Sequence, residues 1–215
     1  MGSKVLSHKK VALVDSGIAN LNSVEKALRW VGLDVVVTND SSELKSAAGV
    51  VFPGVGSFAQ AMLHINKNGL DTVLEEVVGS GKPFLGICLG LQLFFTSSEE
   101  SYEVEGAEIG GLNWLAGEVK RFPPGQPIPH VGWNRAFLCQ KGHPLFNGLP
   151  ERPYFYFTHS YYVDPEDAGV KLSETAYGVN FASSVAKGNL MGVQFHPEKS
   201  GPEGLHLLRN FGNMI

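Results

Sequence analysis

The sequence predicts an α/β fold in which a central, mostly parallel sheet is flanked by helices and carries an antiparallel extension in its C-terminal half. Over about the first hundred residues, short apolar runs alternate with segments of helical apolar spacing, the order typical of a parallel sheet covered on both faces. After residue 115, β-branched and aromatic runs follow one another between Pro, Gly, Asn and Asp turns. With 215 residues, 43% of them hydrophobic, the chain can bury one substantial core. We therefore expect a single domain over residues 9–215, preceded by a flexible leader at residues 1–8.

Three apolar runs in the first half predict buried parallel strands: Lys10–Val14, Asp34–Thr38 and Gly49–Phe52. Between the first two, Asn22 and Glu25 have the spacing of a capping box and predict a helix that ends at Gly32. Thr72 and Glu75 predict a second capped helix after the third run. The ends of these strands should meet at one edge of the sheet, where α/β folds bind their ligands.

Five runs in the second half predict strands: 118–122, 133–139, 154–163, 178–185 and 190–195. Before them lies an acidic segment, residues 97–108, which we interpret as a solvated loop. Ser200 and Glu203 have capping-box spacing, and Pro202 suits a first helical turn. They predict a closing helix with Leu205, Leu208 and Phe211 turned inward.

The segment Pro83–Gln92 reads as a strand, a sharp turn and a helix, with a cysteine in the turn. Gly86 and Gly90 frame Cys88 in the G-x-nucleophile-x-G pattern, in which a strained turn needs small neighbours. A thiol at a helix N-terminus is favoured as the reactive thiolate. The alternative is a core cysteine on a buried strand, and the glycine frame alone leaves both interpretations open.

A cysteine nucleophile needs a histidine to carry its proton and a third group to orient that histidine. Of the seven histidines, only His196 has a carboxylate close by in a short segment, Glu198, and Pro197 stiffens the link between them. The pair follows an apolar run and so should lie at a strand end. A lone histidine is more often a surface or core residue, but the pairing with Glu198 favours catalysis.

Backbone N–H groups could complete such a site. The glycines of 53–56 allow the backbone to turn toward a developing oxyanion, and the N–H of Leu89 follows the nucleophile directly. An ordinary turn between strand and helix is the alternative for 53–56. Cys139 alternates with Ala136 and Leu138 in a predicted strand, so we interpret it as structural.

Composition argues against several classes of protein function. A net charge of −4 and a pI near 6.0, without a Lys/Arg block, argue against a nucleic-acid partner. No apolar run is long enough to span a membrane, and no signal peptide is evident. No Cys/His spacing suits a metal, so we expect neither metal nor cofactor. Two cysteines in unlike contexts fit a reducing compartment, which makes the cytoplasm the expected location.

Several motifs together resemble the class I (triad) glutamine amidotransferases, a flavodoxin-like fold: 86–90 with Gln92, and 196–198. Within that class, four segments are similar to the glutaminase subunit of imidazole glycerol phosphate synthase: 53–58, 130–134, 158–161 and 194–201. The resemblance runs from about Lys10 to the C-terminus. Each motif alone is weak, but their order and joint presence are specific.

The resemblance implies that Cys88 attacks the amide of L-glutamine to form a γ-glutamyl thioester, that His196 acts as acid and base, and that Glu198 orients His196. It implies that the Val55 and Leu89 N–H groups hold the oxyanion. It also implies a set of glutamine-binding residues: Gly56, Gln92, Glu100, Ser160 and Tyr161. Ammonia would pass to a (βα)8-barrel cyclase subunit in a heterodimer of histidine biosynthesis, with Trp133 and Lys199 at the interface. A solvated surface lysine is the alternative for Lys199.

Three rival functions remain open. One is a glutaminase of the same class that serves another synthase, such as anthranilate or pyridoxal phosphate formation, against which segment 130–134 argues. A second is a free-standing γ-glutamyl hydrolase or cysteine peptidase. A third is a non-catalytic flavodoxin-like binding module, which an intact triad disfavours. We expect a conditional enzyme that is nearly silent until its partner docks, because Gly54 and Gly56 leave the oxyanion strand free to change conformation.

Overall fold

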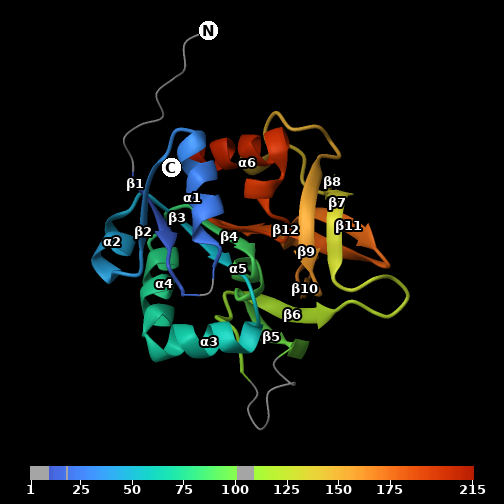
Figure 1. Ribbon diagram of the computed structural model, residues 1–215, viewed down its shortest axis with the longest axis horizontal. Helices are drawn as coiled ribbons and strands as arrows, with labels where there is room; N and C mark the ends of the chain where they lie inside the picture. The colour runs from blue at the N-terminus through green and yellow to red at the C-terminus, as the bar shows by residue number, and fades with distance from the viewer. Residues whose placement is uncertain (1–9, 18, 101–108) are drawn as a thin grey trace.

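The computed structural model describes residues 10–17, 19–100 and 109–215, and its centre is one large twisted sheet with helices on both faces (Figure 1). Five neighbouring strands run parallel, in the order β2 (Asp34–Thr38), β1 (Lys10–Val14), β3 (Gly49–Gly54), β4 (Phe84–Cys88) and β13 (Leu190–Val193). The predicted α/β class with a parallel sheet is confirmed. The predicted leader at residues 1–8 and the greater part of the acidic segment, residues 101–108, lie outside the described residues.

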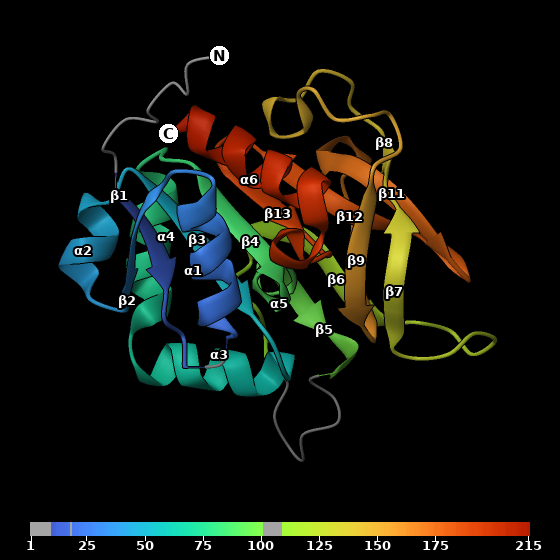
Figure 2. The same ribbon diagram turned by 45° about the horizontal axis from the view of Figure 1, so that its top comes forward.

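Two cores lie on opposite faces of the sheet. In β1, Val11 and Leu13 face one core while Ala12 and Val14 face the other, because side chains alternate along a strand. The first core is closed by α1 (Leu21–Trp30) and α6 (Gly201–Met214), which lie together on the near side in Figure 2. The second is closed by the remaining helices: α2 (Ser41–Ser46), α3 (Phe58–Lys67), α4 (Leu70–Gly79) and α5 (Leu89–Gln92). Burial on both faces explains why these strands are apolar throughout.

The C-terminal half extends the sheet with antiparallel strands, as predicted. β12 (Val179–Lys187) pairs with β13, followed by β10 (Tyr161–Pro165), β6 (Leu115–Arg121) and the edge strand β5 (Phe95–Ser98), which runs parallel to β6. β11 (Lys171–Tyr177) pairs with both β12 and β8 (Phe137–Leu138). β7 (His130–Arg135) and β9 (Tyr154–His159) form a separate two-stranded sheet. Short 3-10 turns also occur among the described residues, at η2 (Pro144–Phe146), η3 (Ala168–Val170) and η4 (Pro197–Lys199).

The three predicted capping boxes are wrong in detail. Asn22 lies inside α1, whose N-cap is Asn20, and Thr72 lies inside α4, whose N-cap is Gly69 at φ 65°. Ser200 is the N-cap of α6 but makes no capping bond, because its hydroxyl bonds to β9 and to the segment before it. Capping residues also occur inside helices, so their spacing alone does not mark where a helix begins.

Among the described residues, four α-helices and β-strands were not predicted, namely α2, α3, β5 and β11. α2 had a readable signal, since Asp40 caps it by accepting hydrogen bonds from the N–H groups of Ser42 and Glu43 at 2.9 and 3.0 Å. The single strand predicted for 154–163 is two strands, β9 and β10, which part at Ser160 and enter different sheets. The strand predicted for 133–139 is likewise divided into β7 and β8. Leu208 and Phe211 are buried as predicted, whereas Leu205 is half-buried.

Candidate active site

The parallel part of the sheet brings three strand ends together. Gly54 at the end of β3 is in register with Cys88 at the end of β4, and Val193 on β13 is in register with Ile87. The segments that follow β3 and β13 therefore emerge on either side of Cys88. Residues that are more than a hundred positions apart in the chain meet at this edge, the usual ligand-binding edge of an open α/β sheet.

Cys88 sits in a strained turn between β4 and α5, with φ 56° and ψ −112°. The glycines around it are required by packing. A Cβ at Gly86 would lie 2.4 Å from Cζ of Phe94, and a Cβ at Gly90 would lie 1.9 Å from the carbonyl oxygen of Phe52. α5 has only four residues, so the field at its N-terminus is weaker than that of a long helix. Activation of the thiol therefore depends more on the neighbouring histidine.

His196 and Glu198 form a buried pair beside Cys88. Nδ1 of His196 donates a hydrogen bond to Oε1 of Glu198 at 2.8 Å, and both side chains are almost completely buried. Nε2 of His196 and Oε2 of Glu198 have no hydrogen-bond partner among the residues that the structure describes. Because Nδ1 carries the proton that Glu198 accepts, Nε2 is the nitrogen available for exchanging a proton with Cys88 or a substrate.

The backbone of His196 is also held in place. Its N–H donates to the carbonyl oxygen of Tyr156 at 2.9 Å, and its carbonyl oxygen accepts from Oγ of Ser200 at 2.6 Å. Oγ of Ser200 in turn accepts from the N–H of Tyr156 at 2.9 Å. This closed ring of bonds ties the histidine to β9 and to the start of α6, which restricts its ring to one orientation.

The electrostatics of His196 favour the imidazolium form. Burial lowers the pKa of His196, but the interactions with Cys88 and Glu198 together outweigh it and raise the pKa to about 10. Interaction with Cys88 is the largest cause that raises the pKa, followed by the hydrogen bond to Glu198, because both groups favour the charged ring. A protonated His196 beside Cys88 is the partner that a cysteine nucleophile needs.

Two buried glutamines join the nucleophile to the opposite wall. Nε2 of Gln92 donates to the carbonyl oxygen of Tyr161 at 3.0 Å and to Oε1 of Gln194 at 3.1 Å. Nε2 of Gln194 lies 3.6 Å from Sγ of Cys88, to which it donates. Gln194 was part of a motif in the sequence but was not predicted as a site residue. Gln194 is buried between the apolar residues Val193 and Phe195. Its amide therefore has no evident role other than these hydrogen bonds.

Glu100 lies at the rim of the site. Its Oε2 accepts a hydrogen bond from the N–H of Phe58 at 2.7 Å, so the carboxylate is bound at the N-terminus of α3. A carboxylate is stabilised there by the helix dipole. The contact fixes a negative charge close to the cleft.

One cleft of about 370 Å³ collects most of the predicted site residues, which are Val55, Gly56, Cys88, Leu89, Gln92, Glu100, Ser160, Tyr161, His196 and Lys199. Glu198 lies behind His196, and Trp133 stands on the outer face of β7 with 56% of its surface exposed. The cleft also has walls that sequence reasoning missed, namely Pro129, Thr158 and His159. Thr158 and His159 stood within a family motif, and that was their only signal.

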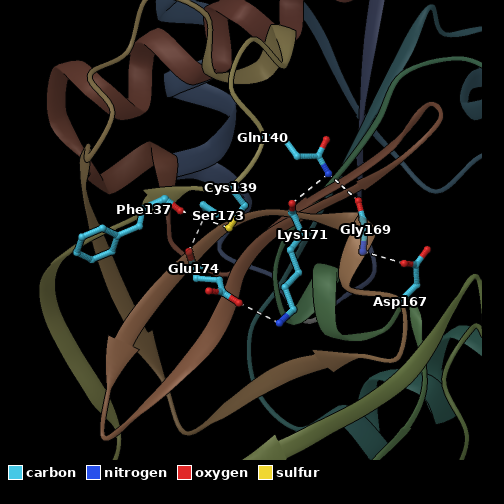
Figure 3. Close-up of polar contacts among 9 residues, drawn as sticks. Phe137, Cys139, Gln140, Asp167, Gly169, Lys171, Ser173 and Glu174 are labelled. Carbon is cyan, nitrogen blue, oxygen red and sulfur yellow. Dashed lines mark hydrogen bonds and ion pairs between the residues drawn. The ribbon is translucent and has the colours of Figure 1, made fainter.

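Cys139 lies where β8 meets β11 (Figure 3). It was interpreted as structural, yet it is exposed rather than packed in a core. Its N–H donates to the carbonyl oxygen of Leu172 at 2.8 Å, and Sγ lies 3.7 Å from the carbonyl oxygen of Phe137. Desolvation and the nearby Glu174 raise the pKa of the Cys139 thiol. Cys139 is therefore a poor nucleophile and a suitable control for Cys88.

In the described part of the chain, no helix has both the length and the apolar character needed to cross a bilayer. Within the same ranges, no three His, Cys, Asp or Glu side chains converge as metal ligands would. The expected absence of metal and cofactor stays a prediction.

The Glutamine amidotransferase class-I family profile matches residues 12–214. The chain belongs to the class-I glutamine amidotransferases. It is therefore a glutamine-hydrolysing enzyme. The imidazole glycerol phosphate synthase subunit HisH of Moorella thermoacetica is 48% identical over 96% of both chains. The HisH subunit of Methanosarcina barkeri is 44% identical over 96% of this chain and 99% of its own.

Solved structures of other amidotransferases share the fold at low identity. PurLQS from Thermotoga maritima superposes with a TM-score of 0.73 at 18% identity, covering 96% of this chain and 98% of that one. A glutamine amidotransferase from the same organism gives a TM-score of 0.61 at 19% identity, over 89% and 76% of the two chains. These likenesses support the amidotransferase architecture and nothing finer.

Proposed function

We propose that the chain is the glutaminase subunit of an imidazole glycerol phosphate synthase. It hydrolyses L-glutamine to glutamate and ammonia, and it passes the ammonia to a (βα)8-barrel cyclase subunit. That subunit makes imidazole glycerol phosphate and aminoimidazole carboxamide ribotide in histidine biosynthesis. One observation carries the proposal: Cys88 and the His196–Glu198 pair share a cleft in a chain 43–48% identical to HisH subunits over nearly its full length.

The chemistry proceeds in two halves. The Cys88 thiolate attacks the side-chain amide carbon of glutamine, and the tetrahedral intermediate expels ammonia as imidazolium His196 protonates the leaving nitrogen. His196, now neutral, takes a proton from water, which attacks the γ-glutamyl thioester and releases glutamate. The proton then restores the imidazolium beside the regenerated thiolate. Glu198 orients His196 and balances its charge through the 2.8 Å bond.

Backbone N–H groups and polar side chains hold the substrate. The N–H groups of Val55 and Leu89 stabilise the oxyanion, since both residues line the cleft next to Cys88. Glu100 accepts the α-ammonium group of glutamine. The other residues proposed to bind glutamine share the same wall and floor of the cleft: Gly56, Gln92, Ser160 and Tyr161.

The cyclase subunit docks over the strand ends in a heterodimer. Trp133 is 56% exposed on β7, and Lys199 lies at the rim of the cleft directly after the triad. An exposed tryptophan beside an active site is typical of an interface hot spot. We also propose the cytoplasm as the compartment, because Cys88 must remain a reduced thiol to act.

Glutamine hydrolysis by the purified chain, alone and with saturating cognate cyclase subunit and its ligand, tests the proposal. We expect turnover to rise by orders of magnitude in the complex, chiefly in kcat. Cys88→Ala should abolish turnover in the complex while Cys139→Ala retains it. Full activity of the chain alone, unchanged by the partner, would favour a free-standing γ-glutamyl hydrolase. A folded Cys88→Ala variant with normal turnover would remove the nucleophile assignment.

A further inference from the structure

Two buried histidines take no part in the chemistry proposed above. His130 on β7 and His159 on β9 are a register pair of the small sheet, and they are 3% and 6% exposed. The His130 ring is stacked between Phe157 and Tyr177, with ring centroids 4.9 and 3.9 Å away. Nδ1 of His130 lies 3.0 Å from Nε2 of His159, so the two rings share a hydrogen bond inside an aromatic cage.

Backbone groups dictate where the protons of these rings lie. Nδ1 of His159 is 2.7 Å from the carbonyl oxygen of Tyr161, which can only accept, so Nδ1 carries a proton. In a neutral ring, Nε2 of His159 must then accept. Its donor is the Nδ1–H group of His130.

Asn134 determines which nitrogen of the His130 ring carries the proton. Its Oδ1 accepts from the N–H of Arg135 at 2.8 Å, and its Nδ2 donates to the carbonyl oxygen of Ala176 at 3.1 Å. The amide is thereby fixed with Nδ2 3.3 Å from Nε2 of His130, to which it donates. Both rings are consequently Nδ1–H tautomers. A second proton on either ring would bring two donors face to face.

Burial also favours the neutral form of both rings. It lowers the pKa of His130 to about 4, and it lowers the pKa of His159 to about 3, with His130 and His196 adding repulsion. The chain of neutral groups continues inward, because the Tyr161 carbonyl oxygen also accepts from Gln92. From Gln92 it reaches Gln194 and Sγ of Cys88.

We propose that His130 and His159 are positioning residues: as a directional pair of neutral Nδ1–H imidazoles running from Asn134, they hold the Tyr161 carbonyl, and through it Gln92, against the glutamine cleft. This deepens the proposed function and rests on it. The pair does not touch the reacting atoms of glutamine. It fixes the wall that Ser160 and Tyr161 form.

The tautomers are tested directly in the isolated chain. Long-range ¹H–¹⁵N NMR of ¹⁵N-histidine-labelled protein, assigned with the His130→Asn and His159→Asn variants, reports the protonation of each ring nitrogen. We expect both residues as neutral Nδ1–H rings from pH 6 to 8, although free histidine favours Nε2–H. An Nε2–H or cationic ring at either position would overturn the proposal.

A matched pair of variants tests the positioning. In His159→Asn the amide nitrogen stands where Nδ1 stood and can still donate to Tyr161, whereas in His159→Gln the amide stands where Nε2 stood and that donor is lost. In the complex with the cyclase subunit, we expect His159→Gln to raise KM for glutamine about tenfold with kcat within threefold. His159→Asn should raise KM less than His159→Gln does, because only the Asn amide can still donate to the Tyr161 carbonyl oxygen. Equal KM values for the two variants would overturn the role.

A second matched pair of variants separates loss of positioning from failure to fold, because both members remove the same ring. His130→Asn and His130→Gln repeat the comparison one ring further out, because only Asn can donate to Nε2 of His159. We expect the Gln variant to raise KM more than the Asn variant, and the reverse order would contradict the relay. If wild-type protein failed to hydrolyse glutamine with its partner, the proposed function would be wrong. The NMR result would still decide whether the two rings are Nδ1–H tautomers.

Discussion

At the scale of single residues, the site keeps two buried polar atoms without partners among the described residues, Nε2 of His196 and Oε2 of Glu198. Burying a polar atom without a hydrogen-bond partner costs about 1–3 kcal/mol of folding free energy. Nε2 of His196 is the nitrogen that must exchange protons with Cys88 and the substrate, so no other side chain of the described part of the chain occupies it. The cost is therefore part of the catalytic arrangement.

His196 and Glu198 should differ in how much their loss damages turnover. His196→Ala removes the group that carries protons and should lower kcat by about 10³- to 10⁴-fold. Glu198→Gln keeps an oxygen that can accept from Nδ1 and loses only the charge, so we expect a smaller loss, on the order of 10- to 100-fold. Steady-state glutaminase assays of both variants in the complex measure this difference. Equal losses would mean that Glu198 does more than orient.

The buried histidines should make the fold acid-sensitive. His130 has a usual pKa of 6.5 that burial lowers to about 4, so between these values the unfolded chain binds more protons and stability is lost as pH falls. His130 alone should cost roughly 2 kcal/mol of unfolding free energy between pH 7 and pH 5. Urea denaturation at both pH values should show a drop for His130→Asn that is smaller by that amount. The same drop in both proteins would contradict the neutral state of His130.

At the scale of elements, the nucleophile turn depends on a close backbone approach between α5 and β3. α5 crosses β3 so tightly that Gly90 leaves no room for a side chain beside Phe52. The turn that strains Cys88 and the packing that sustains the strain are thus one feature.

Gly90→Ala should therefore destabilise the protein by about 3 kcal/mol or more, because its Cβ would lie 1.9 Å from the Phe52 carbonyl oxygen. Gly79 at the end of α4 is the matched control, since a Cβ there meets nothing within 4 Å. Gly79→Ala should be neutral or stabilising by up to about 1 kcal/mol. Chemical denaturation of the two variants provides the comparison, and equal effects would show that the crossing is not tight.

At the scale of the whole molecule, the small sheet of β7 and β9 presents large apolar side chains to solvent. Val131 and Trp133 are each 56% exposed and Tyr154 is 43% exposed, all at one end of the fold. His130 and Asn134, on the same strand as Trp133, begin the hydrogen-bonded chain that leads to Cys88. The surface proposed for the partner and the glutamine cleft are thus two sides of one thin layer.

Trp133→Ala should weaken cyclase binding at least tenfold, because truncating a tryptophan hot spot at an interface costs about 2 kcal/mol or more. Trp30 is 77% exposed at the end of α1 and gives a matched control. Isothermal titration calorimetry with the cyclase subunit should find Trp30→Ala unchanged. Equal affinity for both variants would place the interface elsewhere.

The α/β class, the three N-terminal parallel strands and the glycine-framed turn at Cys88 could be predicted from the amino-acid sequence alone. These features are local or periodic: a strand buried on both faces is apolar throughout, and a strained turn needs small neighbours in fixed positions. The family motifs added residues that no period marks, such as Ser160 and Tyr161. Helix starts were poorly predicted, because Asn22 and Thr72 can cap a helix or lie inside one.

Which distant residues meet depends on the tertiary fold. Register between β3, β4 and β13 brings Cys88 beside His196, and the break at Ser160 sends β9 and β10 into different sheets. Apart from the family motifs that contain them, no sequence pattern marked Gln194 or the pair of His130 and His159, since a buried polar side chain is recognised only by the partners that surround it. The hydrogen bond between His130 and His159 joins residues 29 positions apart, and the one between Gln194 and Cys88 joins residues 106 positions apart. No local preference encodes such contacts, so only the folded chain reveals them.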